Sequence, residues 1–323
     1  QVGRALGKGK FGNVYVAKYR GVTVALKLLW KSSVASDNMG DNVRREVEIQ
    51  SRLRHPNIVR MPGFFEDTKT IYFVLDYAAG GDVYKVLRQH PQGLPGKMAA
   101  RYLLGTARAV AYLHERHIIH RDIKPENLLL DSSGKVKLSD FGWSIHAVPP
   151  MEHERSTLCG TPEYVAPEML LHSPRYTKAV DLWSLGILGF ELLAGVAVLP
   201  TPLGHGCRFA RPRCGYIRCE TSDSWRLLAC ASYHAQVSRT SGALSESPGL
   251  RHAATMAEAN SADINAALYG RIVGWKGSLE ILCKEGMAGF RVPQAARTVL
   301  AGMMRPRATD RVSIEEALRL PWL

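Results

Sequence analysis

The spacing of apolar and polar residues predicts strands in the first part of the chain and helices further on. β-Branched and apolar residues fill residues 23–29 and 71–75 and, in a shorter run, residues 136–138, which is typical of strands. Residues 44–53 and 98–117 instead carry apolar side chains at helical spacing. Each is therefore predicted to form a helix with one buried face.

A further helix is predicted at residues 181–195, where nearly every face is apolar. Such a segment is expected to lie buried in the centre of its part of the fold. Glu191 is the exception, and a carboxylate there needs a partner, either internal or a basic residue of a substrate. Glu191 also interrupts the longest apolar run, residues 182–193, which is too short to cross a bilayer.

The composition is that of an ordinary globular protein. Of 323 residues, 46% are hydrophobic and 22% charged, which is ample for a core. The formal net charge of +13 favours acidic partners such as nucleotide phosphates, microtubule surfaces or nucleic acid. Basic and aromatic residues do not interleave, however, so we expect neither a nucleic acid nor a membrane as a direct partner. Six cysteines without regular spacing and no signal peptide indicate an intracellular, reducing compartment, and Gln1 as first residue suggests an excised domain.

Two motifs point to a particular chemistry. Residues 120–127 read HRDIKPEN, and residues 140–142 follow as DFG. At this separation they resemble the catalytic loop and the metal site of protein kinases. An interpretation in which Asp122 is only a turn residue and Asn127 only a cap leaves the joint pattern unexplained.

This resemblance implies a role for each polar side chain. Phosphoryl transfer needs positioning and charge neutralisation more than covalent chemistry. Asp122 is expected to accept the proton of the incoming hydroxyl, and Lys124 to lie beside the transferred phosphoryl group. Asn127 and Asp140 offer the oxygen ligands that Mg2+ prefers. Lys124 also indicates a serine/threonine kinase, because tyrosine kinases usually carry another residue there.

A glycine-rich loop opens the chain. Residues 6–14 read LGKGKFGNV, in which Gly7, Gly9 and Gly12 would let backbone N–H groups approach phosphates. Dinucleotide-binding folds show similar spacing but place a helix directly after the glycines, and residues 14–16 are poor helix formers. The loop therefore favours the kinase interpretation.

Lys27 stands alone in an apolar strand and needs a negatively charged partner. Phosphate oxygens and a carboxylate would serve, and we assign the carboxylate to Glu46 on the following helix. Glu48 lies two residues further along the same helix and therefore faces a different direction from Glu46. The alternative is that Glu46 is an ordinary surface charge.

The adenine of ATP is expected to meet the link between two lobes. Backbone groups of Asp76 and Ala78 would bind its edge. Four apolar residues would sandwich its ring, although each could equally be plain core: Leu6, Val14, Ala25 and Leu129.

The segment between Asp140 and Glu168 is the expected activation segment. Thr157 lies two residues after an arginine, and its phosphorylation would add up to two negative charges. Arg45 and Arg121 could pair with that phosphate and order the segment. An unmodified loop threonine is the alternative, because sequence does not record modification.

Five longer stretches resemble the Aurora kinases. They read LGKGKFGNVY, RREVEIQSRLRHPNI, HRDIKPENLLL, DFGWS and TLCGT. Trp143 directly after DFG, and Gln50 in the helix of Glu46, are unusual in kinases generally and typical of Auroras. The resemblance is dense from Val2 to about Gly195 and returns at the C-terminus.

The resemblance implies a bilobal α+β protein-kinase fold over residues 1–323. A small β-rich lobe would occupy residues 1–75, a hinge residues 76–82, and a mainly helical lobe residues 83–323. It also implies an ATP- and Mg2+-dependent kinase of mitotic chromosome or spindle proteins, with an activator protein on the small lobe. Nucleus, spindle and cytoskeleton are the locations it implies.

Three carboxylates match positions connected with substrate arginines. Glu126 and Glu191 fall where arginine-directed kinases hold an arginine that precedes the phosphorylated serine or threonine. Glu126 is also counted with the nucleotide-binding residues, and Asp82 adds to the pocket and contacts ribose. In the same comparison Arg311 would form a structural ion pair with Glu168.

The chain departs from Auroras in two places. Residues 162–167 read PEYVAP where animal Auroras usually have LDYLPP. After Gly195 the family pattern is lost over about residues 196–257, which contain arginine but no lysine and are expected to be a long loop or disordered. This stretch is either a lineage-specific insertion or translated intron, and residues 274–289 raise the same question. Zinc is not favoured because no CxxC pair occurs among Cys207, Cys214, Cys219 and Cys230, with His205 nearby.

Two alternatives to an Aurora-type enzyme stay open. One is a kinase of another arginine-directed subfamily, which shares the chemistry. The other is a catalytically dead scaffold, because an irregular large lobe can disable an intact set of motifs.

Overall fold

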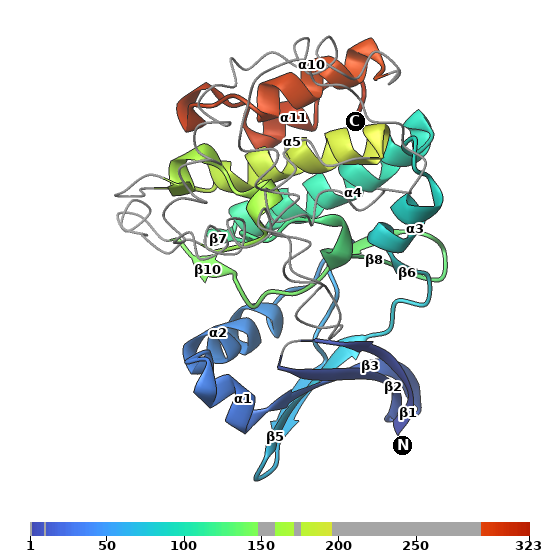
Figure 1. The fold of residues 1–323 in the computed structure, drawn as a ribbon, viewed down its shortest axis with the longest axis vertical. Coiled ribbons are helices and arrows are strands. Elements are labelled where there is room, and N and C mark those ends of the chain that lie inside the picture. Colours follow the sequence, from blue (N-terminus) through green and yellow to red (C-terminus); the bar gives the residue numbers. More distant parts are fainter. Residues whose placement is uncertain (1, 10, 148–158, 171–175, 196–291) are drawn as a thin grey trace, which may run out of the picture.

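The computed structural model describes residues 2–9, 11–147, 159–170, 176–195 and 292–323. In Figure 1 the strands of the N-terminal part form one end of the molecule, and the helices of the remainder form the other. This is the predicted bilobal α+β arrangement. The stretches 196–257 and 274–289, their candidate zinc ligands and Thr157 all lie outside the described residues.

The small lobe is built on an antiparallel five-stranded sheet in the order β1-β2-β3-β5-β4. Arg20 and Gly21 both have positive φ, 52° and 80°, as a tight hairpin turn between β2 and β3 requires. The strands are β1 (Val2–Lys8), β2 (Gly12–Tyr19), β3 (Val22–Trp30), β4 (Gly63–Glu66) and β5 (Thr70–Asp76).

Two helices accompany this sheet, α1 (Lys31–Ser36) and α2 (Gly40–Gln50). The predicted helix at 44–53 was placed too late: α2 begins at Gly40 and ends at Gln50. Leu53 is buried, but it reaches the core from the turn that follows the helix. The apolar side chain of Leu53, at helical spacing from those before it, had therefore been counted with the helix.

The large lobe is built around helix α5 (Ala179–Ala194), which is buried along its whole length. It packs against α4 (Gly96–His114) on one side and α10 (Gln294–Met303) on the other (Figure 1). At Gly189 a Cβ would come within 2.5 Å of Leu300 and 2.8 Å of Leu103, so glycine allows this close packing. Gly195 ends α5 in the left-handed conformation that suits glycine (φ 74°).

The remaining helices of the described residues are short. They are α3 (Val83–Gln89), α11 (Ile314–Ala317) and the 3-10 turns η1 (Pro125–Asn127), η3 (Pro162–Tyr164), η4 (Pro167–Leu170) and η5 (Ala308–Asp310). The predicted pair between Arg311, after η5, and Glu168 in η4 is confirmed, with N···O distances of 2.6 and 2.7 Å. Among the described helices, none is long and apolar enough to cross a membrane.

Small sheets place the catalytic segments beside the join between the lobes. One sheet has the order β6-β8-β9, with β6 (Gly81–Asp82), β8 (Leu128–Leu130) and β9 (Val136–Leu138), and a second pairs β7 (Ile118–Ile119) with β10 (Ile145–His146). From the small lobe, Asn57 accepts from the Leu138 N–H at 2.8 Å and donates its side chain to the Val136 carbonyl at 2.9 Å. Because Asp140 follows β9 directly, this contact fixes the start of the DFG segment.

Candidate active site

The backbone of the catalytic loop is held by Asp181, at the beginning of α5. The N–H groups of His120 and Arg121 each donate to its carboxylate at 2.9 Å, and His114 Nε2 lies at the same distance. Arg121 adopts a positive φ of 67°, an unfavourable conformation for a non-glycine residue that this anchor stabilises. Burial would raise the pKa of Asp181, but the His114 hydrogen bond, the histidine charges and the Arg121 N–H lower it.

Sequence reasoning missed Asp181. It treated Glu191 as the one buried carboxylate of this helix, and that was wrong, because Asp181 is completely buried as well. The partners of Asp181 are mainly backbone groups some 60 positions earlier in the chain, which a local pattern does not reveal.

Asp122, the expected proton acceptor, is surrounded by donors. Lys124 Nζ lies 2.8 Å from one carboxylate oxygen, and Thr161 donates to the other at 3.0 Å. Lys124 also donates to Thr161 Oγ1 at 2.7 Å, and the Asn127 side chain donates to Asp122 at 2.8 Å. Thr161 was not predicted, although its position within the Gly-Thr-Pro-Glu string at the end of the activation segment is the signal that could have found it.

The expected metal ligands come from neighbouring segments. The N–H and hydroxyl of Ser139 both donate to the Asn127 carbonyl, at 2.8 and 2.9 Å, which places Asp140 beside Asn127. Both hydrogen bonds from Asn127 Nδ2 go to Asp122, so its oxygen Oδ1 is the atom left for a cation. Asp140 is half-exposed and has a positive φ of 62°. One amide oxygen and one carboxylate fit the preference of Mg2+ for hard oxygen ligands.

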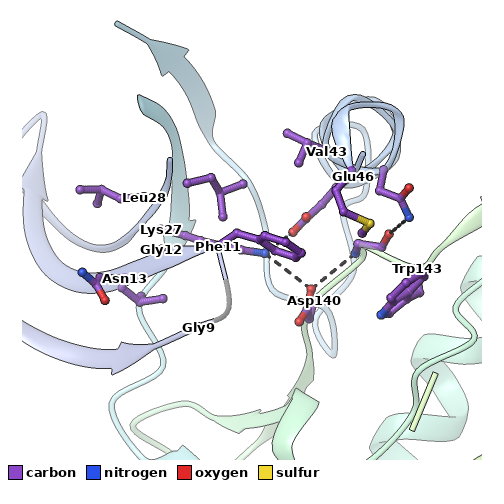
Figure 2. A pocket seen from close by; sticks show the side chains of 15 residues that line it. Gly9, Phe11, Gly12, Asn13, Lys27, Leu28, Val43, Glu46, Asp140 and Trp143 are labelled. Carbon is purple, nitrogen blue, oxygen red and sulfur yellow. Dashed lines mark hydrogen bonds and ion pairs between the residues drawn. The ribbon is translucent and has the colours of Figure 1, made fainter. Parts of the chain in front are cut away.

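The predicted contact between Lys27 on β3 and Glu46 on α2 is present, at 2.7 Å. Lys27 Nζ also lies 3.5 Å from Asp140, so a single ammonium faces two carboxylates (Figure 2). Burial would lower the pKa of Lys27, but the charges of Asp140 and Glu46 more than offset this and raise it. The same ammonium lowers the pKa of Asp140. Burial raises the pKa of Glu46, and the charge of Lys27 opposes that rise.

Figure 2 shows the cavity between the glycine loop, β3, α2 and the DFG segment. Its lining includes Gly9, Gly12, Val14 and the three charged groups just described. Phe11, Asn42 and Trp143 are among the lining residues that were not predicted to belong to the site. Asn42 donates to the Gly142 carbonyl at 3.1 Å and so ties α2 directly to the DFG segment.

The glycines of the loop differ in what they permit. A Cβ at Gly12 would lie 1.7 Å from the Leu28 carbonyl oxygen, so glycine is required there for strand packing. A Cβ at Gly7 meets nothing within 4 Å, and the nearest atom to one at Gly9 is 3.6 Å away. Only Gly7 and Gly9 therefore leave open space at the surface of the loop.

The apolar residues expected around adenine come from strands β1, β2 and β3 of the small lobe and β8 of the large lobe. Leu6, Val14 and Leu129 are partly exposed, and Ala25 is buried. The Asp76 N–H donates to the Arg60 carbonyl at 2.9 Å, so it is not available to a ligand. Ala78 is partly exposed in the segment between β5 and β6.

The three carboxylates assigned to a substrate arginine have different surroundings. Glu191 is buried and accepts a hydrogen bond from the Tyr164 hydroxyl, so it has the internal partner considered from the sequence. Asp82 caps α3, accepting from the Lys85 N–H at 2.8 Å, and forms an ion pair with the Lys85 ammonium. Glu126 lies in η1, which packs against the strand that ends at Asp82.

Arg121 is one of the two arginines predicted to pair with a phosphate at Thr157. It donates to the Trp143 carbonyl at 2.7 Å and to the Tyr176 hydroxyl at 2.5 Å. Burial raises the pKa of the Cys159 thiol, while the charges of Arg121 and Arg45 oppose the rise. Thr157 itself lies outside the described residues, so its pairing with Arg45 and Arg121 stays a prediction.

The family model described as "Protein kinase domain" matches residues 1–323, the whole chain. The chain belongs to the protein kinase family. The kinase is 47% identical over 213 residues to "Aurora kinase" of Schizosaccharomyces pombe, which covers 65% of this chain and 59% of that protein. It is 49% identical over 197 residues to "Serine/threonine-protein kinase Aurora-1" of Arabidopsis thaliana, covering 60% of this chain and 65% of the relative.

A third comparison concerns "Aurora kinase C" of Mus musculus. It is 48% identical over 197 residues, which are 60% of this kinase and 70% of the mouse protein. The predicted Aurora-type serine/threonine kinase resemblance is thereby confirmed. The kinase spans less than two thirds of the fission yeast and Arabidopsis Aurora-1 relatives.

Proposed function

We propose that this kinase transfers the γ-phosphoryl group of ATP to serine or threonine hydroxyls of proteins. The observation that carries this proposal is the cluster around Asp122, in which Lys124, Thr161 and Asn127 orient one carboxylate. A carboxylate held in this way can accept a hydroxyl proton while the neighbouring ammonium compensates the charge that develops.

The other side of the cleft is suited to hold ATP. Lys27, kept charged by Glu46 and Asp140, provides a cation for phosphate oxygens. Asn127 and Asp140 would hold Mg2+, which when bound neutralises charge on the phosphates. Gly7 and Gly9 leave room for backbone N–H groups to approach the phosphates, and the segment from Asp76 to Ala78 would meet adenine.

We assign the substrate preference to acidic residues of the large lobe. Glu126, Glu191 and Asp82 would contact arginines that precede the phosphorylated residue. Because Tyr164 already donates to Glu191, a substrate arginine there would share or replace that hydroxyl.

Further properties of the proposal rest on the Aurora relatives. Phosphorylation of Thr157, paired by Arg45 and Arg121, would activate the kinase, and an activator protein would bind the small lobe. Chromosome or spindle proteins of mitosis are the proposed substrates, and the nucleus and spindle the proposed locations.

The test measures phosphate transfer from Mg-ATP to a peptide with arginine two and three residues before a serine. A parallel reaction uses the same peptide with both arginines replaced by alanine. Asp140→Asn should abolish transfer, whereas the matched surface change Asp310→Asn should leave it unaltered. Transfer that requires the arginines and Asp140 supports the proposal.

Failure of transfer, even after Thr157 has been phosphorylated by another kinase, contradicts the proposal. The kinase-fold scaffold would then be the better interpretation. Transfer that does not require the arginines would support the kinase activity but refute the assignment of Glu126, Glu191 and Asp82 to a substrate-arginine pocket.

A further inference from the structure

Helix α4 and the turn that follows it carry a basic stripe on a surface that the proposed chemistry does not use. Arg108 and Tyr112 lie four residues apart in α4, so their side chains share one face of the helix, and Arg116 lies in the turn after its last residue, His114. Arg108 and Arg116 are exposed. Four residues of α-helix span about 6 Å, and Arg116 extends the stripe beyond the end of the helix.

Tyr112 organises the centre of this surface. The His55 ring stacks on it with centroids 4.9 Å apart, and the Arg116 guanidinium lies 3.6 Å from the Tyr112 ring centre. The Arg54 N–H donates to the Tyr112 hydroxyl at 3.0 Å. The ring therefore joins the loop after α2 to the stripe on α4 and fixes the Arg116 guanidinium in place.

His55 adds a hydrogen-bond donor to the surface. The Asn57 N–H donates to His55 Nδ1 at 3.1 Å, so in the neutral ring the proton is on Nε2. Burial and the charges of Lys135, Arg116 and Arg108 lower the pKa of His55, with Glu115 opposing them. Cations from α4 and from the β8–β9 hairpin thus gather around one ring.

The cations at this surface have few carboxylate partners. In the described part of the chain, Arg108, Lys135 and Lys137 form no ion pair, and Arg116 has only an exposed contact with Glu115 at 3.5 Å. Lys137 instead donates to the Pro56 carbonyl at 3.2 Å. Asp131 lies on the same hairpin, but its carboxylate accepts hydrogen bonds from the Ser133 hydroxyl and the Lys135 N–H. The surface is consequently rich in donors and short of acceptors.

We propose that this surface, made of His55, Arg108, Tyr112, Arg116, Lys135 and Lys137, binds an extended acidic segment of a partner protein. An extended chain rises about 3.3 Å per residue and presents alternate side chains on one edge, so Asp or Glu residues at alternate positions would reach successive cations of this surface. Arginine guanidinium groups match carboxylates with paired hydrogen bonds. The Tyr112 ring is already occupied by His55 and Arg116, which leaves no stacking platform for a nucleic-acid base.

The test is binding of a fluorescent hexapeptide with four Glu residues, compared with the same peptide carrying Gln, at low salt. The variant Arg108→Glu/Lys135→Glu reverses two exposed charges of the surface. The matched control, Lys97→Glu, reverses an exposed charge at the start of the same helix. Unchanged thermal unfolding would show that each variant is folded.

We expect the Glu peptide to bind the wild type and Lys97→Glu, and to bind the double variant at least about tenfold more weakly. Raising the salt concentration should weaken the wild-type interaction. Equal binding to the wild type and the double variant overturns the proposal. So does preferential binding of a phosphopeptide or of single-stranded DNA at this surface when the Glu peptide does not bind. None of these readouts depends on phosphate transfer.

Discussion

The ion pair between Arg311 and Glu168 provides the sharpest test of the packing of the large lobe. All five N–H donors of the guanidinium are used: two meet the Glu168 carboxylate, and the others meet the carbonyls of Ala179, Arg305 and Pro306. The Arg311 side chain is only 1% exposed and that of Glu168 11%. One residue thus joins the end of the activation segment to α5 and to the C-terminal segment.

The change Arg311→Lys keeps the charge but reduces five donors to three, so two acceptors lose their partners. Each buried polar group left unpaired costs about 1–3 kcal/mol, which gives about 2–6 kcal/mol for two. Because the ammonium still faces Glu168, we expect a loss of about 3 kcal/mol in the free energy of unfolding. Arg311→Ala, which leaves the carboxylate unpaired, should cost about 4 kcal/mol.

Urea unfolding followed by circular dichroism measures this loss. With a slope of about 3 kcal/mol per M for a domain of this size, the midpoint for Arg311→Lys should fall by about 1 M. The control Arg307→Lys makes the same change at an exposed position and should stay within about 0.5 kcal/mol. Combining Arg311→Lys with Glu168→Gln should cost less than the sum of the two. Additive costs, or a loss as small as that of the control, would refute the reasoning.

Three further predictions follow from contacts of the catalytic segments. Asn42→Asp turns a donor into a carboxylate 3.1 Å from the Gly142 carbonyl and should lower kcat about tenfold in steady-state kinetics. The control Asn38→Asp makes the same change at an exposed position and should leave kcat unaltered. Equal kcat values for Asn42→Asp and the wild type would show that this contact does not position the DFG segment. Because the folded-state pKa of Asp181 is lowered, its contribution to stability is present above about pH 4 and is lost as the pH falls through that lowered value. Urea unfolding between pH 3 and 7 should therefore show a steeper acid loss in the wild type than in Asp181→Asn, and parallel curves would contradict this. Tyr164→Phe removes a donor from buried Glu191 and should cost about 1–3 kcal/mol in urea unfolding, and a neutral result would show that other contacts suffice.

The sequence predicted those features of the site that lie within a motif or in a strongly patterned segment. Lys27 was found because a lysine in an apolar strand requires a partner, and Glu46 because it is a carboxylate in the helix predicted after that strand, where Glu48 faces elsewhere. The C-terminal end of α2 was misplaced because the apolar Leu53 lies in the turn after the helix.

Contacts that depend on tertiary structure were not predictable in this way. Thr161 meets Asp122 only because the activation segment returns to the catalytic loop 39 positions later. Gly12 was assigned to phosphate binding from its spacing, but the approach of the Leu28 carbonyl also requires glycine there, and only the folded sheet shows this. Local pattern thus identifies residue types, whereas long-range packing decides which atoms they meet.

The anchoring of the catalytic loop on Asp181 has a consequence for how the cleft can work. Asp122 and Asn127 take their positions from the large lobe, whereas Lys27 and Glu46 move with the small lobe. Asp140 lies in the segment after β9 of the large lobe and forms an ion pair with Lys27 of the small lobe. Rotation of one lobe against the other would therefore change the separation of these two groups of residues without reorienting Asp122. A ligand that closes the lobes would therefore bring the two groups of residues together without changing the arrangement within either group.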